Sequence, residues 1–308
     1  MKRLLHKTAK IAAIVLSVLL ALLIVFTVYH KISLKLESGK ITPNGQLVEV
    51  GGNKLHVYTE GSNSIAPTLV FLSGGGTVAP IYDFKPLYSR LSDRYTIAVI
   101  EKLGYGYSDI ANSSRDINTV LSQSREALKL AGITLPYVLI PHSMSGLEAL
   151  YWAKKYPDEV SAIIGLDMAT PEYYQSGNLQ MPPISLLSLA TSIGLQKLPF
   201  VYPDLALSDS EFYQAKLLSY RNVVNRAVVN ETKALTSNVD TVSNVGIPNV
   251  PLLMFCGDGI GIGDLWISYQ ESFAAKSNAR LVKLDCGHYL HQFEPERIAN
   301  EISDFLLR

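Results

Sequence analysis

Residues 137–149 read YVLIPHSMSGLEA. An apolar run ends at Pro141, and Ser143 follows two places later with small residues around it. A helical pattern then begins at once, with Leu147 on an apolar face and Glu148 interleaved. The stretch therefore predicts a strand, a sharp turn at a serine, and a helix. Ser143 would lie at the C-terminal edge of a sheet and at the N-terminus of a helix, where backbone N–H groups favour developing negative charge.

Such a turn is called a nucleophile elbow, and its usual pattern is G-x-S-x-G. Pro141 and Ser145 stand where the two glycines would be, and Gly146 comes one place late. Small residues are needed in this turn because it brings the strand and helix backbones close together. Taken alone, the window also fits an ordinary exposed serine between a strand and a helix.

Composition bounds the class of protein. The chain has 308 residues, of which 48% are hydrophobic and 18% charged, so it can fold as one large domain with a sizeable core. Lys+Arg and Asp+Glu both number 27, so no global field recruits nucleic acid. Cys256 and Cys286 lack metal-site spacing. We interpret them as buried free thiols, with a single bridge between them as the alternative.

The N-terminal region predicts a membrane anchor. Residues 11–29 are apolar and uncharged, and as a helix they would span about 28 Å, close to the thickness of a bilayer core. Basic residues precede this segment, and no small-residue cleavage site follows it. We expect residues 1–45 to comprise a cytoplasmic N-terminus, a single transmembrane helix and a stalk that begins at about residue 31. The charge bias places the following domain on the extracytoplasmic side.

Beyond residue 45, strand and helix patterns alternate, which is typical of a parallel sheet covered on both faces. A helical stretch over residues 171–246, including the capping box at Ser208 and Glu211, interrupts the alternation. An insertion of this kind, on the C-terminal side of the strands, would cover a site as a lid. The main expected strands are residues 68–72, 95–100, 137–140, 162–166, 250–256 and 280–284.

Four motifs in this order carry a resemblance to a known family. They are FLSGG (71–75), GYGYS (104–108), HSMSG (142–146) and CGHYLH (286–291), each after an expected strand. From residue 46 to 308 the sequence resembles the α/β-hydrolase superfamily. The resemblance implies an α/β fold with a mostly parallel sheet of about eight strands, helices on both faces and a helical lid at 171–246.

The resemblance implies a Ser-His-acid triad with Ser143 as the nucleophile. A serine hydroxyl needs a base to take its proton. His288 is the candidate, because it follows a strand and comes last in the order Ser…Asp…His that this fold uses. The alternative is that His288 has a structural role in the last loop.

The acid is the uncertain member of the triad. The family most often places it after the next-to-last strand, where Ile260 stands here. Asp258 is near that place, and Asp264 is expected to cap a helix that begins at Leu265. Some relatives take the acid from the strand after the elbow, where Asp167 stands. We favour Asp167, with Asp258 as the alternative.

An oxyanion hole would combine the backbone N–H of Met144 with one from the glycine run, and Gly75 is the candidate there. The same glycines could form a phosphate cradle, but the run lacks the spacing and the lysine of phosphate-binding loops.

These expectations lead to a membrane-anchored serine hydrolase of carboxylic esters that needs no metal or cofactor. A small, moderately apolar ester is the expected substrate, because the lid region is rich in apolar and aromatic residues. A peptidase or amidase of the same fold is one alternative. A catalytically silent binding module is another, since the elbow glycines and the acid depart from the usual pattern. The lid residues concerned, most of which would alternatively serve to pack the lid on the sheet, are Tyr173, Tyr174, Leu186, Leu187, Leu189, Ile193, Leu195, Phe200 and Tyr202.

Overall fold

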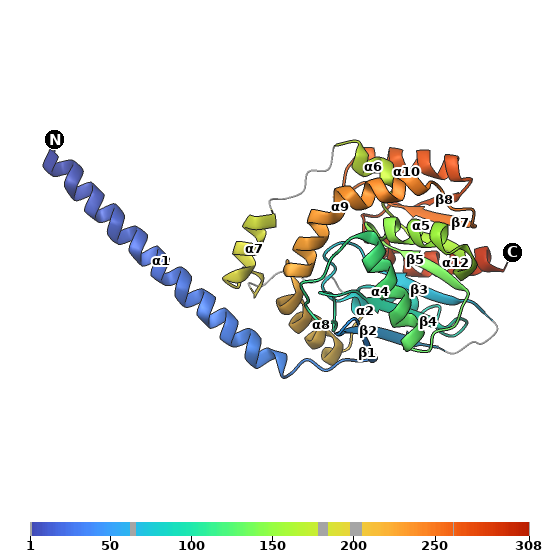
Figure 1. The fold of residues 1–308 in the computed structure, drawn as a ribbon, viewed down its shortest axis with the longest axis horizontal. Helices are drawn as coiled ribbons and strands as arrows, with labels where there is room; N and C mark the ends of the chain where they lie inside the picture. The colour runs from blue at the N-terminus through green and yellow to red at the C-terminus, as the bar shows by residue number, and fades with distance from the viewer. Residues whose placement is uncertain (1, 62–65, 178–183, 198–204, 261, 308) are drawn as a thin grey trace.

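A computed structural model describes residues 2–61, 66–177, 184–197, 205–260 and 262–307 (Figure 1). Within these residues the strands form one eight-stranded sheet in the order β1-β2-β4-β3-β5-β6-β7-β8. The β1–β2 and β2–β4 pairs are antiparallel, and all the other pairs are parallel. The expected sheet is therefore confirmed. The strands are β1 (Gln46–Val50), β2 (Asn53–Glu60), β3 (Thr68–Leu72), β4 (Ile97–Glu101), β5 (Tyr137–Pro141), β6 (Val160–Leu166), β7 (Leu252–Cys256) and β8 (Arg280–Lys283).

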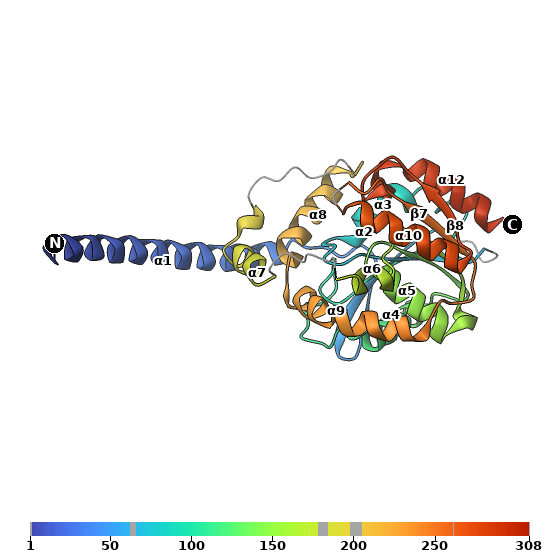
Figure 2. The same ribbon diagram turned by 90° about the horizontal axis from the view of Figure 1, so that it is seen from above.

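The helices lie on both faces of this sheet (Figure 2). Side chains of α4, α5 and α10 join the apolar core on one face, and those of α2, α3 and α12 join the core on the other. The helices are α1 (Lys2–Ser38), α2 (Pro80–Asp83), α3 (Lys85–Tyr88), α4 (Ile117–Leu130), α5 (Ser145–Lys155), α6 (Pro171–Gln175), α7 (Ile184–Ser192), α8 (Asp209–Asn222), α9 (Arg226–Val245), α10 (Asp264–Ser277), α11 (Leu290–Phe293) and α12 (Pro295–Leu306), with short 3-10 turns η1 (Pro157–Glu159) and η2 (Leu195–Lys197).

Helix α1 extends away from the rest of the molecule (Figures 1 and 2). Its residues from His6 to Ser38 are long and apolar enough to cross a membrane, and the most apolar part is not buried against the protein. The helix continues through Ser38, past residue 31, where the sequence predicts a stalk. Ser33 and Glu37 hydrogen bond to one another in this last part, one turn apart on the same helix.

Helices α6 to α9 lie between β6 and β7 in the chain, and we call residues 171–246 the β6–β7 segment. Helix α8 begins with the expected capping box, in which Ser208 and Glu211 satisfy each other's backbone N–H groups. The expected cap at Asp264 is wrong. The N-cap of α10 is Gly263, and Asp264 is the first helical residue, where its charge still complements the helix dipole.

The loop after β4 is built around a buried carboxylate. Glu101 accepts hydrogen bonds from the backbone N–H groups of Ile81 (3.2 Å) and Tyr107 (2.7 Å), and it lies 2.9 Å from Nδ1 of His56. Gly106 approaches this carboxylate so closely that a Cβ at its position would lie 1.9 Å from it. The close approach explains the glycine in the GYGYS motif.

Replacing Gly106 should therefore destabilise the fold strongly. Gly106→Ala combines a left-handed φ of 48° with the clash against Glu101, and we expect it to lower the free energy of unfolding by about 3 kcal/mol or more. Gly132→Ala is the matched control, because Gly132 has a φ of 75° with nothing within 4 Å of the added Cβ. Its loss should stay near 1 kcal/mol. Chemical denaturation measures both, and equal losses would contradict this account of the loop.

Candidate active site

Ser143 occupies a strained turn between β5 and α5. Its φ is 53°, a left-handed conformation that a non-glycine residue adopts only when its surroundings enforce it. Here the backbone carbonyl of Ser143 accepts hydrogen bonds from the N–H groups of Gly146 (2.9 Å) and Ala169 (2.8 Å). The turn therefore presents the serine at the C-terminal edge of the sheet, as the sequence predicts.

The departures from G-x-S-x-G have a structural explanation. Pro141 is the last residue of β5 and pairs with Leu72 at the end of β3. The hydroxyl of Ser145 donates to the carbonyl oxygen of Leu72, 2.6 Å away, so this small polar residue ties the turn to β3. The tight approach falls on Gly146, where a Cβ would lie 2.3 Å from the carbonyl oxygen of Ala169. The glycine one place late meets the steric requirement.

Asp167 follows directly after β6 and is buried, with a φ of 45°. Its Oδ2 lies 2.6 Å from Nδ1 of His288. Its Oδ1 accepts from the backbone N–H of Gly257 at 3.1 Å and from the side chain of Gln270 at 2.5 Å. Both carboxylate oxygens are therefore engaged, which fixes the carboxylate plane and, through it, the imidazole of His288.

Asp258 does not reach His288 in this structure. Its carboxylate accepts from the backbone N–H of Ile260 at 2.9 Å, two residues on, and so it closes its own loop. Its backbone N–H donates to the carbonyl oxygen of Cys286 (3.0 Å). Of the two acids that the sequence leaves open, the structure brings only Asp167 together with the histidine.

His142 connects the elbow to the His288 loop. Its ring lies 4.6 Å from that of His288, and its Nε2 lies 3.1 Å from the backbone carbonyl oxygen of His288. Burial and the neighbouring histidines His291 and His288 hold the pKa of His142 well below its usual range, so the ring is neutral. Since Ser143 follows His142 in the chain, these contacts bring the serine and the His288 loop to the same edge of the sheet.

The glycine run after β3 lies against the elbow. A Cβ at Gly74 would be 2.9 Å from Cβ of Ser143, and one at Gly75 would be 3.0 Å from Cε of Met144. Among the described residues, neither the N–H of Gly75 nor that of Met144 has a hydrogen-bond partner. Two N–H groups are thus available beside the serine, in the loop positions expected from the sequence.

The surroundings of His288 are aromatic. The ring of Trp266 meets that of His288 edge-on at 5.5 Å, and Tyr173 packs against Trp266 at 4.6 Å. The leucines expected to make the region apolar behave differently, since Leu186 and Leu189 of α7 are 62% and 53% exposed. They supply no buried pocket. Phe200 and Tyr202 lie outside the described residues.

Cys256 and Cys286 are free thiols, and burial raises their pKa values to about 12 and about 11.

Among the described residues, Asp83, His142 and His291 bring potential metal-ligating atoms within 4.8 Å of one another. Asp83 is already paired there, because its Oδ2 lies 3.1 Å from Nε2 of His291. We assign no metal to this group.

Comparison with known proteins agrees with the fold. Residues 67–199 match the family model described as alpha/beta hydrolase fold. Over 322 residues the chain is 34% identical to the uncharacterized protein YbdG of Bacillus subtilis (strain 168), and the alignment covers 98% of each chain. The chain belongs to the α/β-hydrolase family.

More distant relatives include enzymes. The α/β-hydrolase described here is 30% identical over 125 residues to the 2-(acetamidomethylene)succinate hydrolase of Mesorhizobium japonicum, covering 39% of this chain and 41% of that protein. The enol-lactonase from Burkholderia xenovorans LB400 superposes with a TM-score of 0.62 at 16% identity, covering 85% of this chain and all of that one. The structural likeness concerns the fold, and family membership indicates a hydrolase.

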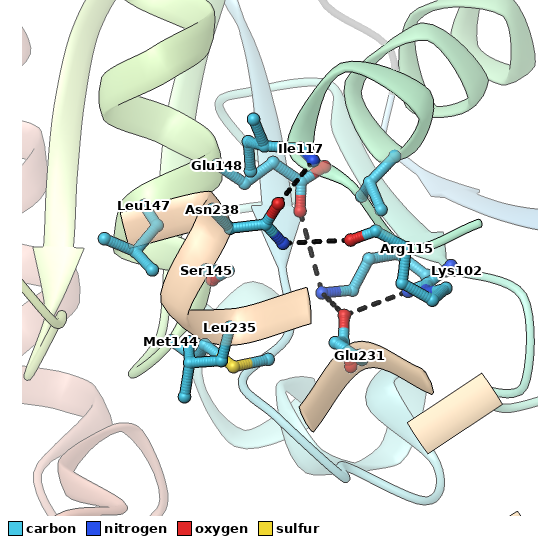
Figure 3. A pocket seen from close by; sticks show the side chains of 11 residues that line it. Lys102, Arg115, Ile117, Met144, Ser145, Leu147, Glu148, Glu231, Leu235 and Asn238 are labelled. Atoms are coloured by element: carbon cyan, nitrogen blue, oxygen red, sulfur yellow. Dashed lines mark hydrogen bonds and ion pairs between the residues drawn. The ribbon is translucent and has the colours of Figure 1, made fainter. Parts of the chain in front are cut away.

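A cluster of buried charges, which the sequence did not reveal, lies beside the elbow of this hydrolase (Figure 3). Glu231 of α9 pairs with Nη2 of Arg115 at 2.9 Å and with Nζ of Lys102 at 3.3 Å. Lys102 also lies 3.6 Å from Glu148 of α5, and Tyr105 donates its hydroxyl proton to Glu231. The cluster joins the β6–β7 segment to β4 and to the elbow helix.

Sequence reasoning missed this cluster for a simple reason. Glu148 reads as part of the polar face of α5, yet it is 2% exposed, and the hydroxyl of Ser124 donates to it at 2.8 Å. Its partners lie far away in the chain, at spacings that no local pattern relates. The one sign of the cluster in the sequence is that its four charged residues occur next to segments with an apolar periodicity.

The pH dependence of stability tests the cluster. Burial by itself would raise the pKa of Glu231, but Lys102 and Arg115 outweigh burial and lower it to about 2. A depressed carboxyl pKa gives stability that is present above the unfolded-state value of 4.5 and is lost as the pH falls toward 2. This contribution should be roughly 3 kcal/mol.

The measurement compares the wild type with Glu231→Gln by chemical denaturation between pH 2 and pH 7. The wild type should be more stable by about 3 kcal/mol at pH 7, and the difference should shrink below pH 4.5. Glu60→Gln is the control, since Glu60 lies at the end of β2, outside the cluster. A difference between wild type and Glu231→Gln that does not change with pH would contradict the assignment.

Proposed function

We propose that this protein is a membrane-anchored serine hydrolase that cleaves small carboxylic esters through an acyl-enzyme. One observation carries the proposal: Asp167 holds His288 by a 2.6 Å contact beside the strained turn of Ser143. In this role Ser143 is the nucleophile, His288 the general base and Asp167 the residue that orients the imidazole.

The reaction runs in two halves. His288 takes the hydroxyl proton of Ser143 at Nε2 as Oγ attacks the ester carbonyl carbon, and the negative charge develops on the former carbonyl oxygen. The N–H groups of Gly75 and Met144 stabilise that oxygen. The C–O bond to the alcohol breaks, and the alcohol leaves with the proton from His288. Water then repeats the sequence on the acyl-enzyme and releases the acid.

Asp167 contributes through the tautomer of the histidine. Its Oδ2 accepts a hydrogen bond from the N–H at Nδ1 of His288, which keeps the proton on Nδ1 and leaves Nε2 unprotonated and able to act as a base. The carboxylate also stabilises the imidazolium that forms during each half-reaction. Because Oδ1 is held by Gly257 and Gln270, the carboxylate cannot rotate away.

We further propose that residues 11–29 anchor the enzyme in a membrane as a single span, with the catalytic domain on the extracytoplasmic side. The length and apolar composition of α1 support the anchor, and the basic residues before it support the orientation. The aromatic surroundings of His288 support a moderately apolar substrate.

Loss of the nucleophile should abolish turnover. Ser143→Ala should lower kcat for a p-nitrophenyl ester by about a million-fold, leaving only the residual rate that the oxyanion hole and substrate binding supply. Ser145→Ala is the matched control, since it removes a neighbouring hydroxyl that bonds only to backbone carbonyls. Its activity should stay within about tenfold of the wild type, as expected for the loss of a single hydrogen bond. Equal turnover by Ser143→Ala and wild type would refute the assignment.

The two candidate acids can be separated in the same way. Asp167→Asn should lower kcat by about 10⁴-fold, because the amide would favour the wrong histidine tautomer. Asp258→Asn should change kcat by less than about tenfold, since its carboxylate bonds within its own loop. If Asp258→Asn alone shows the large loss, Asp258 is the acid.

Two further measurements on the wild type test the alternative functions. Turnover of a series of amide substrates separates the esterase from a peptidase, and labelling by a fluorophosphonate separates it from a silent binding module.

A further inference from the structure

Helix α1 is attached to the β6–β7 segment. Nζ of Lys197 lies 2.6 Å from Glu37 Oε2 and 2.6 Å from Ser33 Oγ. One turn earlier on α1, Nε2 of His30 lies 3.0 Å from Nε2 of Gln196, the residue before Lys197. The segment that borders the candidate site is thereby held against the last turns of the apolar helix.

The same helix is joined to α8 at its end. The side chain of Gln214 accepts from the backbone N–H of Thr42 at 3.0 Å and donates to the carbonyl oxygen of Lys40 at 2.9 Å. Together with the η2 contacts, these bonds fix the β6–β7 segment at two heights along α1. The position of the segment relative to the apolar span is therefore defined.

Helix α7 directly precedes the η2 turn that contacts α1, and it lies on the side of the domain from which α1 extends (Figures 1 and 2). Its sequence, ISLLSLATS, contains no charged residue. Leu186, Leu187 and Leu189 are 62%, 37% and 53% exposed, and Leu195 just beyond the helix is 43% exposed. An apolar face of this kind, which the described residues leave largely exposed, marks a surface that contacts something else.

The position of this surface along α1 indicates what it contacts. His30, which the η2 turn contacts, is the first residue after the apolar span of residues 11–29. The surface of a bilayer crossed by that span would therefore lie at the height of α7. Lys31 and Lys35 are exposed on α1 near the same height, where the phosphates of lipid headgroups would attract them.

We infer that the leucine face of α7 docks on the bilayer that α1 crosses, and that the enzyme draws its ester substrate from that bilayer. This inference rests on the proposed function. The substrate class is then an ester with an acyl or alcohol chain long enough to partition into lipid. The leucines enter the headgroup region, as in an interfacial helix.

Contacts on the other side of the β6–β7 segment connect this surface to the site. Asn222 at the end of α8 donates to the carbonyl oxygens of Val78 (2.7 Å) and Gly106 (2.8 Å). A Cβ at Gly76 would lie 4.0 Å from Cγ1 of Val228 in α9. One end of the segment thus faces the glycine run beside Ser143, and the other faces the lipid.

Fluorescence quenching tests the docking without relying on activity. Leu189→Trp and the control Leu130→Trp are made in the full chain and reconstituted into vesicles of phosphatidylcholine and phosphatidylglycerol with brominated acyl chains. The native Trp152 and Trp266 are 0% and 3% exposed and provide the same background in both. Leu130 is 50% exposed on α4, away from α1.

We expect the brominated lipid to quench the emission added by Trp at position 189 by about twofold or more, as for a residue within the headgroup region. The emission added at position 130 should be unaffected. Equal quenching at the two positions, or none at either, would overturn the docking.

Hydrolysis tests the substrate class. In vesicles, Leu186→Glu combined with Leu189→Glu should lower turnover of a p-nitrophenyl palmitate dissolved in the bilayer by about tenfold, because the charges oppose insertion. Turnover of water-soluble p-nitrophenyl acetate should stay within about twofold, as should both activities of Leu130→Glu. Equal effects on the two esters would overturn the substrate class. Quenching at position 189 with no turnover of either ester would leave the docking intact and refute the proposed function.

Discussion

The contact between Asp167 and His288 is the constraint on which the site depends. It joins residues 121 positions apart in the chain, from the ends of two strands that β7 separates in the sheet. A buried carboxylate is costly unless its oxygens are hydrogen bonded, and here Gly257 and Gln270 donate to Oδ1 while His288 contacts Oδ2. The order of the parallel strands is therefore what brings the imidazole, the carboxylate and the turn of Ser143 to one edge.

The sequence was informative wherever a local pattern records a local requirement. The apolar run, the small residues and the helical period around Ser143 predicted the elbow, and the alternation of strands and helices predicted the sheet. The capping box at Ser208 is another such case, because both partners lie within one turn. The sequence shows that the glycine of the elbow stands one place late, at Gly146, but only the structure explains why a glycine is needed there.

Features that depend on distant partners were harder to predict. Asp167 and Asp258 both follow strands, and only the packing of Gln270 and His288 distinguishes them in the structure. No local sequence pattern around Glu231, Arg115 or Lys102 indicates that these residues pair in the fold. Likewise, the leucines of α7 read as pocket residues, and their exposure became visible only in three dimensions.

The central claim is that Ser143 carries the acyl group during turnover. Mixing the full-length protein with a p-nitrophenyl ester, quenching with acid within the first turnover and mapping the peptides by mass spectrometry tests it directly. The account predicts one acyl adduct, on the peptide that contains Ser143. An adduct on another residue, or hydrolysis without an adduct at any quenching time, would contradict it.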